Sequence, residues 1–248
     1  MEPPLPYPLS NILIDSMPDA SRKSLLHHLK AVALPVKTSL YEPDDLPKYV
    51  HFLTSGIASI VTSMVGGETT EVGTVGREGL PQGVHLLGPV AITTRCFMQV
   101  AGTGLRMEYK VFERIFNTEE AVRRPVLAYA QYQSILLGQV AGCNRLHDVE
   151  PRLARWLLMV QDRTGDSVLA LTQEFLGQMI GSQRTTVSAV AGELQQRGLI
   201  EYSRGKVRIL NRTGLENAAC ECYLATRKIL STLYSTTGQA LFDEVAPK

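Results

Sequence analysis

The chain has 248 residues and a formal net charge of +1, from 25 Lys and Arg against 24 Asp and Glu. This length allows two modest domains, and the near-neutral charge excludes a chain that is basic throughout. No run of 18 or more apolar residues occurs, and the start, MEPPLPYPLSN, lacks the basic and apolar regions of a signal peptide. We therefore expect a cytoplasmic protein with no membrane partner.

The first half of the chain has the pattern of a small antiparallel β-roll. A short helix is predicted over residues 21–29. Between residues 36 and 107, short apolar runs alternate with breaks rich in Gly, Pro and Asp, which is typical of antiparallel strands. The predicted strands span 50–53, 57–61, 71–75, 97–100 and 105–107, and a helix over 108–116 follows them.

A long helix is predicted over residues 125–146, with Pro125 in its first turn, where the missing N–H of proline costs little. Mostly apolar residues recur along it at steps of 3 and 4. This spacing suits a seam with a second helix, but the same residues could equally pack against their own β-roll. The six positions are Val126, Tyr129, Gln133, Leu136, Val140 and Cys143.

Residues 171–210 have the pattern of a winged helix-turn-helix. Gly177 is small where two crossing helices would touch, and Gly181 can take the left-handed conformation that a three-residue turn requires. A second helix is predicted over 183–196, with an inward stripe of Val187, Val190 and Leu194. Two short strands joined at 203–206 would form the wing. This pattern predicts that the chain binds double-stranded DNA.

The charge of this segment supports that interpretation. Residues 182–212 hold six Arg or Lys against two Glu, a net charge of +4 that suits contact with phosphates. Arg184 is the predicted reader of guanine, because Arg makes the commonest specific base contact. The full set of predicted DNA contacts is Thr172, Gln183, Arg184, Thr185, Ser188, Arg204 and Lys206, of which Thr172, Arg204 and Lys206 would hold phosphates.

The whole pattern resembles the Crp/Fnr family of bacterial transcription regulators, the relatives of the cyclic-AMP receptor protein and the fumarate–nitrate regulator. The similarity extends to HDVEPRLARWLL at 147–158, which resembles the family's hinge Asp and first DNA-binding helix. It also extends to VHFLTSG at 50–56 and GTVGREG at 73–79, which resemble strands and turns of the family's β-roll.

The resemblance implies an α+β protein with an N-terminal antiparallel β-roll of the jelly-roll type, a long dimerisation helix and a C-terminal winged helix-turn-helix. The expected domains are 1–146, including the dimerisation helix at 125–146, then 147–215 for DNA binding and 216–248 for a C-terminal helix. It also implies a homodimer that reads a two-fold symmetric DNA site and a contact with RNA polymerase. Thr185 and Ala189 replace the family's usual Glu and Arg, so the half-site should differ from the common ones.

The effector of such a regulator is not identified by the sequence. Members that bind cyclic AMP carry a Gly-Glu-Leu-Gly turn, but this chain has Arg77 at the Glu position. It also has Leu137 and Gly138 where those members have Thr and Ser on the dimer helix. These departures disfavour cyclic AMP. Arg77, Glu78 and Arg95 remain candidates for an effector pocket, with surface turns or structural ion pairs as the alternative.

Metal and haem sites are not expected. An iron–sulfur cluster needs about four convergent thiolates. Cys220 and Cys222 lie two apart in a predicted helix and would point to different sides, with Cys143 on the seam and Cys96 near the roll. Haem ligation by one His is disfavoured, because a lone His is usually structural.

Other functions stay open at this point. A regulator controlled by its own abundance needs no effector. A cupin-like enzyme needs two His and a carboxylate at metal spacing, but the five His are scattered and no catalytic motif appears, so no catalytic residue is assigned. A ligand-binding module that contacts protein in place of DNA would leave the basic hairpin unexplained.

Overall fold

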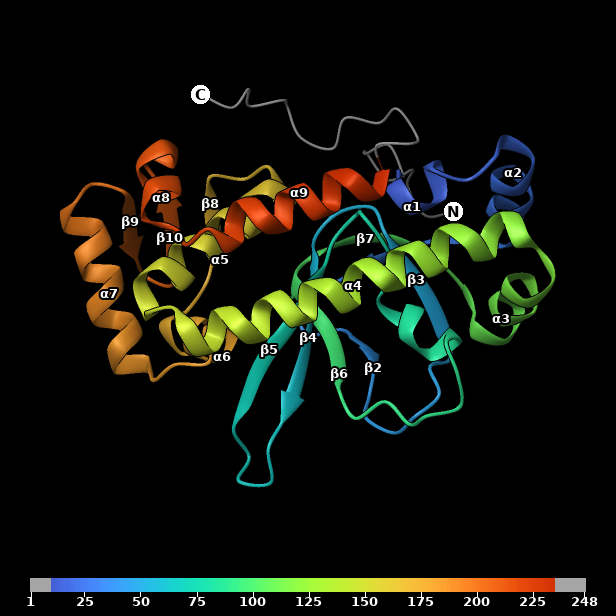
Figure 1. The fold of residues 1–248 in the computed structure, drawn as a ribbon, viewed down its shortest axis with the longest axis horizontal. Helices are drawn as coiled ribbons and strands as arrows, with labels where there is room; N and C mark the ends of the chain where they lie inside the picture. Colours follow the sequence, from blue (N-terminus) through green and yellow to red (C-terminus); the bar gives the residue numbers. More distant parts are fainter. Residues whose placement is uncertain (1–9, 235–248) are drawn as a thin grey trace. The chain divides into compact units, whose positions relative to one another are not determined.

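The computed structural model describes residues 10–234. It has the predicted fold class, a mixture of helices and antiparallel sheets (Figure 1). The chain divides into two compact units, residues 1–58 with 75–129 and residues 59–74 with 130–248. These units differ from the domains expected at 1–146, 147–215 and 216–248, whose limits stay a prediction. Residues 235–248 of the expected C-terminal helix lie outside the described residues.

The antiparallel strands predicted for the β-roll are present, and most of β4 and β5 belongs to the second unit. One sheet has the order β1-β7-β3, with Phe52 of β3 opposite Leu105 of β7. The other has the order β2-β6-β4-β5. The strands are β1 (Lys30–Leu34), β2 (Ser39–Tyr41), β3 (Tyr49–Leu53), β4 (Ile57–Ser63), β5 (Thr69–Val75), β6 (Arg95–Val100) and β7 (Gly102–Glu108). All five predicted strands are present, and β1 and β2 are additional.

Helices accompany these strands. They are α1 (Ile12–Asp15), α2 (Asp19–His28), the 3-10 helix η1 (Pro81–Leu86) and α3 (Tyr109–Thr118). The helices predicted over 21–29 and 108–116 correspond to α2 and α3. The core is closed by aromatic side chains such as Phe52 and Phe112, whose rings meet edge to face at 5.3 Å.

The long helix α4 (Glu120–Leu146) begins five residues earlier than predicted. Pro125 therefore lies inside the helix and not at its start, so the carbonyl of residue 121 loses its usual helical donor. Val122 and Val126 are both fully buried on the same side of this helix. Their packing offsets the loss, which explains why the prediction from proline alone placed the helix start too late.

The second unit contains the β4–β5 hairpin beyond residue 58, the end of α4 and the C-terminal elements (Figure 1). Helix α5 packs against α6, α7, α8 and α9, with Leu153, Trp156 and Leu157 buried. A small sheet has the order β8-β10-β9. The bounds are α5 (Val149–Thr164), β8 (Val168–Ala170), α6 (Gln173–Ile180), α7 (Arg184–Gln196), β9 (Ile200–Ser203), β10 (Lys206–Ile209), α8 (Arg212–Ala218) and α9 (Cys222–Tyr234).

The described part of the segment after the wing forms two helices and not the single C-terminal helix predicted over 216–248. Ala219 is extended, with φ −75° and ψ 152°, and it ends α8. Residues 219–221 then connect α8 to α9. This break was not visible in the sequence, because Ala, Cys and Glu carry no strong helix-stop signal. Within residues 10–234, no helix combines the length and apolar character needed to cross a bilayer.

Candidate nucleic-acid interface

The turn between α6 and α7 has the close approach predicted for the two glycines. A Cβ atom on Gly177 would lie 2.9 Å from the carbonyl oxygen of Ser182, so a larger residue would push the turn away from α6. Gly181 has φ +59° and ends α6 in the left-handed conformation. The predicted helix-turn-helix is therefore confirmed, with the second helix beginning at Arg184 and Gln183 as its N-cap.

Helix α7 buries the stripe that fixes its orientation. Val187, Ala191 and Leu194 are buried at i, i+4 and i+7, whereas Val190 is only half-buried. The predicted inward residues Val187 and Leu194 are thus confirmed, and Ala191 takes the middle of the stripe in place of Val190. Because this face is covered, the opposite face of the first turn is free to meet a ligand.

The polar start of α7 lies on the surface. Gln183, Arg184 and Thr185 are exposed. Ser188 is half-buried, and its hydroxyl lies 2.6 Å from Oε1 of Gln173 and 2.9 Å from the carbonyl oxygen of Arg184. Since a hydroxyl has one proton, Ser188 donates inside the domain and is the least available of these predicted contacts.

Thr172 caps α6. Its hydroxyl oxygen accepts a hydrogen bond of 3.1 Å from the backbone N–H of Phe175, while the residue stays exposed. The hydroxyl proton remains available for an acceptor outside the chain, which is compatible with the predicted phosphate contact.

The wing is a tight hairpin of β9 and β10. Arg204 and Gly205 form its two-residue loop with φ +49° and +73°, the conformation of a type I′ turn. A non-glycine residue in this region is uncommon, so the loop holds the Arg204 side chain at an unusual, exposed point. Lys206 at the start of β10 is exposed as well.

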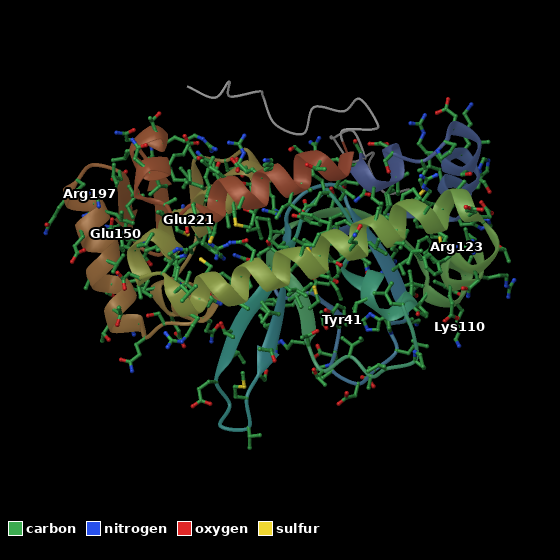
Figure 2. The ribbon with its side chains drawn as sticks, viewed as in Figure 1. Tyr41, Lys110, Arg123, Glu150, Arg197 and Glu221 are labelled. Atoms are coloured by element: carbon green, nitrogen blue, oxygen red, sulfur yellow. The ribbon has the colours of Figure 1, made fainter. Side chains whose placement is uncertain are left out.

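The basic residues of this segment fall into two groups. Arg197 pairs with Glu150 (Figure 2), Arg208 with Glu201 at 3.4 Å and Arg212 with Asp162 at 2.6 Å. Among the described residues, the other three have no acidic partner within 4.0 Å. These three are Arg184, Arg204 and Lys206. We call them the free cations, and they occupy the start of α7 and the tip of the wing.

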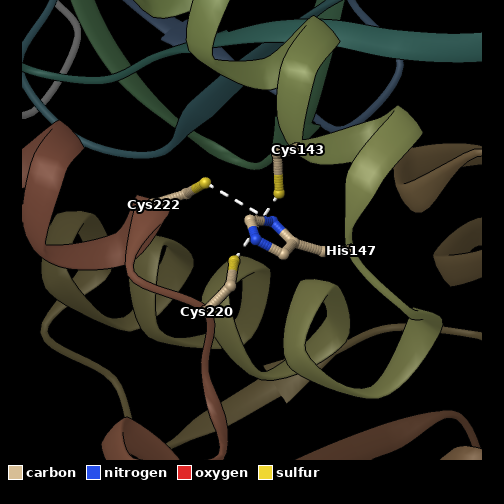
Figure 3. A group of neighbouring side chains, drawn as sticks. All are labelled: Cys143, His147, Cys220 and Cys222. Carbon is tan, nitrogen blue, oxygen red and sulfur yellow. Dashed lines mark hydrogen bonds between the residues drawn. The ribbon is translucent and has the colours of Figure 1, made fainter.

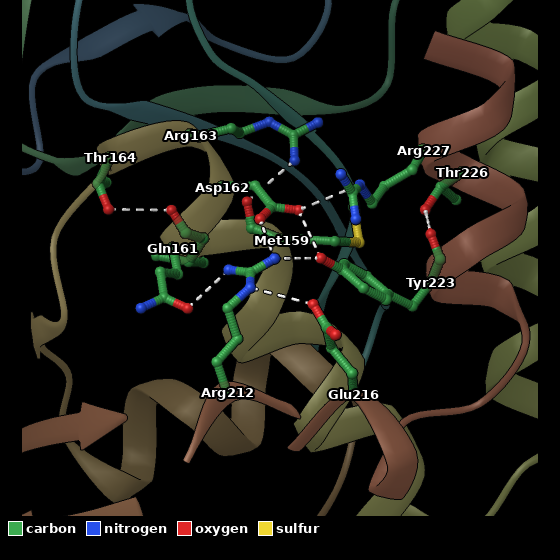
Figure 4. A network of polar contacts seen from close by, with 11 residues as sticks. Met159, Gln161, Asp162, Arg163, Thr164, Arg212, Glu216, Tyr223, Thr226 and Arg227 are labelled. Atoms are coloured by element: carbon green, nitrogen blue, oxygen red, sulfur yellow. Dashed lines mark hydrogen bonds and ion pairs between the residues drawn. The ribbon is translucent and has the colours of Figure 1, made fainter. Parts of the chain in front are cut away.

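The ion pair of Arg212 belongs to a network that fixes α8 and α9 to α5 (Figure 4). Arg212 also donates to Oε1 of Glu216 at 3.0 Å, and the Tyr223 hydroxyl donates to Oδ2 of Asp162 at 2.9 Å. Burial, followed by the charge of Asp162, raises the pKa of Tyr223, so its hydroxyl stays protonated and donates. The charge of Arg212 is therefore neutralised by acidic residues of the protein itself.

The start of α7 also lines a groove of about 540 Å³. Its other wall comes from the β4–β5 hairpin, where Glu68, Thr69 and Thr70 face Gln178 and Arg184. The hydroxyl oxygen of Thr70 lies 2.8 Å from the position of a Cβ on Gly181. In this conformation the hairpin therefore lies beside the predicted base-reading end.

Comparison with known proteins agrees with this geometry. Residues 151–218 match the family model of the Crp-like helix-turn-helix domain, so this part of the chain is a Crp-like helix-turn-helix domain. The match begins inside α5 and ends at α8, so it includes the turn, the reading helix and the wing. No curated protein matches the chain significantly.

Solved structures share the fold over most of the chain. The c-di-GMP-responsive global regulator CLP from Xanthomonas campestris is 16% identical, with a TM-score of 0.64 over 77% of this chain and 99% of its own. FixK2 from Bradyrhizobium japonicum is 15% identical, with a TM-score of 0.65 over 77% and 98%. A CRP-family transcriptional regulator from Thermus thermophilus is 20% identical, with a TM-score of 0.62 over 77% and 96%. The β-roll, long helix and winged helix-turn-helix implied by the resemblance are thus confirmed as the fold.

Outside the Crp-like domain, the three pocket candidates have different surroundings. Arg77 is exposed, Glu78 is buried, and Arg95 is exposed with its guanidinium 4.8 Å from the ring centre of Phe97. The turn that carries Arg77 is covered by Tyr129, whose Cζ would lie 1.9 Å from a Cβ on Gly79. Their role as an effector pocket stays a prediction.

The six residues of the predicted seam lie mostly inside the chain. Val126, Tyr129, Leu136 and Cys143 are buried, and Gln133 and Val140 are half-buried. Of the two alternatives left open by their spacing, the structure places these side chains in the packing of the chain itself. The periodicity identified the inward face of α4 and not an exposed one.

Three cysteines next to the Crp-like domain are brought together, contrary to the expectation that their positions diverge. Cys220 precedes α9, and only Cys222 is helical, so the two do not point to opposite sides of one helix. Cys143 and His147 approach them from the end of α4. The hydrogen bond between the Cys143 and Cys220 thiols, whose sulfurs lie 3.6 Å apart, lowers the pKa of Cys143. The missed signals were C-x-C at 220–222 and C-x-x-x-H at 143–147.

Proposed function

We propose that this chain is a non-enzymatic transcription regulator of the Crp/Fnr type, a homodimer that binds a two-fold symmetric DNA site. The observation that carries this proposal is the position of the free cations in a Crp-like domain. Arg184 lies at the exposed start of the second helix of the helix-turn-helix, and Arg204 and Lys206 lie at the wing tip. In this motif the start of the second helix contacts base edges and a basic wing contacts phosphates. Arg184 is therefore placed to contact bases, and Arg204 and Lys206 are placed to contact phosphates.

The proposed roles of individual residues follow from exposure and hydrogen-bond use. Arg184 reads guanine, because its guanidinium can donate two parallel hydrogen bonds to O6 and N7. Thr185, also exposed, contacts a thymine methyl group or a polar base edge. Lys206 and Arg204 hold phosphates. Ser188 positions Gln173 by its hydrogen bond of 2.6 Å and contributes to base reading only indirectly.

The proposed dimer uses the outward face of α4. Leu127, Ile135 and Leu137 are 43%, 48% and 40% exposed on this helix, although they are large and apolar. Large apolar side chains that stay exposed on a long helix favour contact with a second helix. Gly138 has open space where a Cβ would stand, which allows a second helix to approach closely. The seam proposed here therefore differs from the six residues named from periodicity.

We further propose that cyclic AMP is not the effector. The turn at Gly76–Gly79 carries Arg77 where cyclic-AMP-binding members carry Glu, and the Tyr129 ring lies directly over Gly79. A ligand that used this turn would have to displace a fully buried tyrosine. Isothermal titration with cyclic AMP is expected to give no heat of binding. Contact with RNA polymerase remains part of the proposal.

The test is selection of bound sequences from random DNA duplexes, followed by gel-shift titration. The proposal predicts an enriched two-fold symmetric motif. Arg184→Ala should relax the motif at one base pair of each half-site and cost roughly 1–3 kcal/mol for the selected site. The matched control is Lys228→Ala, which removes one exposed positive charge from α9. Binding without any enriched motif, or an equal loss in both variants, would refute the proposal.

A further inference from the structure

Four side chains with metal-binding atoms converge beside the Crp-like domain (Figure 3). Cys143 lies in the last turn of α4, and His147 directly follows this helix, four residues later. Cys220 and Cys222 lie in the connection between α8 and the start of α9. The three cysteines are buried, and all three thiols are free. Within residues 10–234, no other group of three or more His, Cys, Asp or Glu comes together in this way.

The spacing of these four atoms is that of ligands around one ion. The Sγ atoms of Cys143 and Cys220 are 3.6 Å apart, and Nδ1 of His147 is 3.6 Å from Sγ of Cys222. All four ligand atoms lie within 4.8 Å of one another. Around a tetrahedral Zn²⁺, two sulfurs lie about 3.8 Å apart and a sulfur and a nitrogen about 3.6 Å apart, given bonds of about 2.3 and 2.0 Å.

We propose that Cys143, His147, Cys220 and Cys222 bind one Zn²⁺ ion. Three thiolates and one imidazole form a donor set that zinc takes in structural sites. All four positions are filled by the protein, so the ion has no open position for a substrate and is structural. On binding, the metal displaces the protons that the thiols still carry, and those protons go to solvent.

The orientation of His147 supports the assignment. Its Nε2 lies 3.2 Å from Oε1 of Glu221, and its Nδ1 faces the thiols. A proton on Nε2 that is donated to this carboxylate leaves the lone pair of Nδ1 directed into the group. Metal-binding histidines almost always donate their second N–H to a carboxylate, a carbonyl or water in this manner. Glu221 lies between Cys220 and Cys222, so one short segment supplies two ligands and the partner of a third.

Further neighbours complete the surroundings of the group. Nε2 of Gln139, one turn before Cys143 on α4, donates to Sγ of Cys222 at 3.0 Å. Arg152 and Arg155 on α5 are buried, and the Nε atom of each has no hydrogen-bond partner among the described residues. Both interact electrostatically with Cys143, and Arg155 also with Glu71. Buried cations need nearby negative charge, and a Zn²⁺ with three thiolates carries a net charge of −1.

Two other uses of these thiols fit the geometry less well. A cluster with two or more irons separates the thiolates of different irons further than one ion does, whereas these four atoms span at most 4.8 Å. A disulfide between Cys143 and Cys220 would need a sulfur separation of about 2.0 Å. It would also leave Cys222 and the oriented His147 without a role.

The ion would join the end of α4 to the α8–α9 connection. Residues 219–221 lie between α8 and α9 and have no regular structure. This break allows Cys220 and Cys222, on either side of Glu221, to reach the same point. Zinc would thus fix the start of α9 to the end of α4, next to the Crp-like domain. This inference does not depend on DNA binding, because none of the four ligands is among the predicted DNA contacts.

The test is metal analysis of the full chain purified under reducing conditions, by elemental mass spectrometry and native mass spectrometry. One zinc per chain is expected, and its removal by a chelator should lower the melting temperature, which added Zn²⁺ should restore. Cys220→Ser and Cys222→Ser should lose the ion, whereas Cys96→Ser, which removes the buried cysteine outside the group, should keep it. Glu221→Gln should weaken zinc affinity about 10-fold.

A second measurement protects the test against variants that fail to fold. Replacement of zinc by Co²⁺ in the unmodified chain should give the absorption of tetrahedral cobalt, with a sulfur-to-metal charge-transfer band. The proposal is overturned if the reduced chain holds no stoichiometric metal, if it holds iron with inorganic sulfide, or if its mass shows only a disulfide. Each of these results leaves the DNA-binding proposal intact.

Discussion

The indole Nε1 of Trp156 donates a hydrogen bond of 2.8 Å to Oε1 of Glu71. The other carboxylate oxygen accepts a hydrogen bond of 2.6 Å from Ser59, and all three side chains are buried. The contact joins β5 to α5 inside the second compact unit. Burial raises the pKa of Glu71 to about 7, against the lowering effect of its two hydrogen bonds.

The pKa of Glu71 predicts a pH-dependent stability. Between pH 4.5 and 7 the folded state keeps a proton that the unfolded state has released, so stability falls as pH rises through this range. The loss due to Glu71 is on the order of 3 kcal/mol, and Glu71→Gln should remove it. Urea denaturation at pH 5 and pH 7.5 measures the effect.

The comparison with Glu71→Gln is needed because His51 acts in the opposite direction. Burial lowers the pKa of His51 to about 4. The stability that the neutral His51 contributes to the fold is therefore lost as pH falls from 6.5 to 4. Glu68→Gln, an exposed position on the same hairpin, serves as control and should keep the pH dependence of the parent. If Glu71→Gln keeps it too, Glu71 is not the responsible group.

The wing should bind DNA without reading sequence. Lys206→Ala is expected to lower the affinity for selected and for unrelated duplexes by the same factor, because a phosphate contact is the same for every base pair. The slope of the logarithm of affinity against the logarithm of salt concentration should fall by about 1 for each protomer bound. Gel-shift titrations at several salt concentrations check this. A changed motif with an unchanged salt slope would assign Lys206 to base reading.

The outward face of α4 should control the oligomeric state. Ile135→Glu is expected to weaken dimerisation at least 10-fold, because the charge would have to be desolvated in an apolar interface. Sedimentation equilibrium measures the change. Leu224→Glu, a 65% exposed apolar position on α9, is the control and should dimerise as the parent does. A parent that is monomeric at all concentrations would refute the proposed dimer.

The network around Asp162 should stabilise the fold without affecting sequence preference. Asp162 accepts from Arg212 and Tyr223, and its side chain is only 7% exposed. Asp162→Asn removes the negative charge, so a loss of roughly 1–3 kcal/mol in the free energy of unfolding is expected. Circular dichroism during urea titration measures it. Asp166→Asn, at an exposed position, should change stability by less than about 0.5 kcal/mol, and the DNA motif should be the same in both.

The sequence by itself determined the elements that are fixed by interactions between residues close together in the chain. Gly181 takes a left-handed conformation that few other residues tolerate, and the spacing of Val187 and Leu194 sets one face of a single helix. A two-residue turn with Gly205 likewise fixes the wing between neighbouring strands. The helix-turn-helix and its exposed basic residues could therefore be predicted from 40 consecutive residues, 171–210.

Only the tertiary structure decided what depends on partners far along the chain. The periodicity of α4 marked an apolar stripe, but whether that stripe meets a second copy or its own chain depends on the packing of other elements, and Val126 and Leu136 are buried inside. Cys143 and Cys220 are 77 residues apart, and they meet only because α8 ends at Ala218 and the chain turns before α9. Helix breaks without Gly or Pro are stabilised by such distant contacts, which local propensity does not encode.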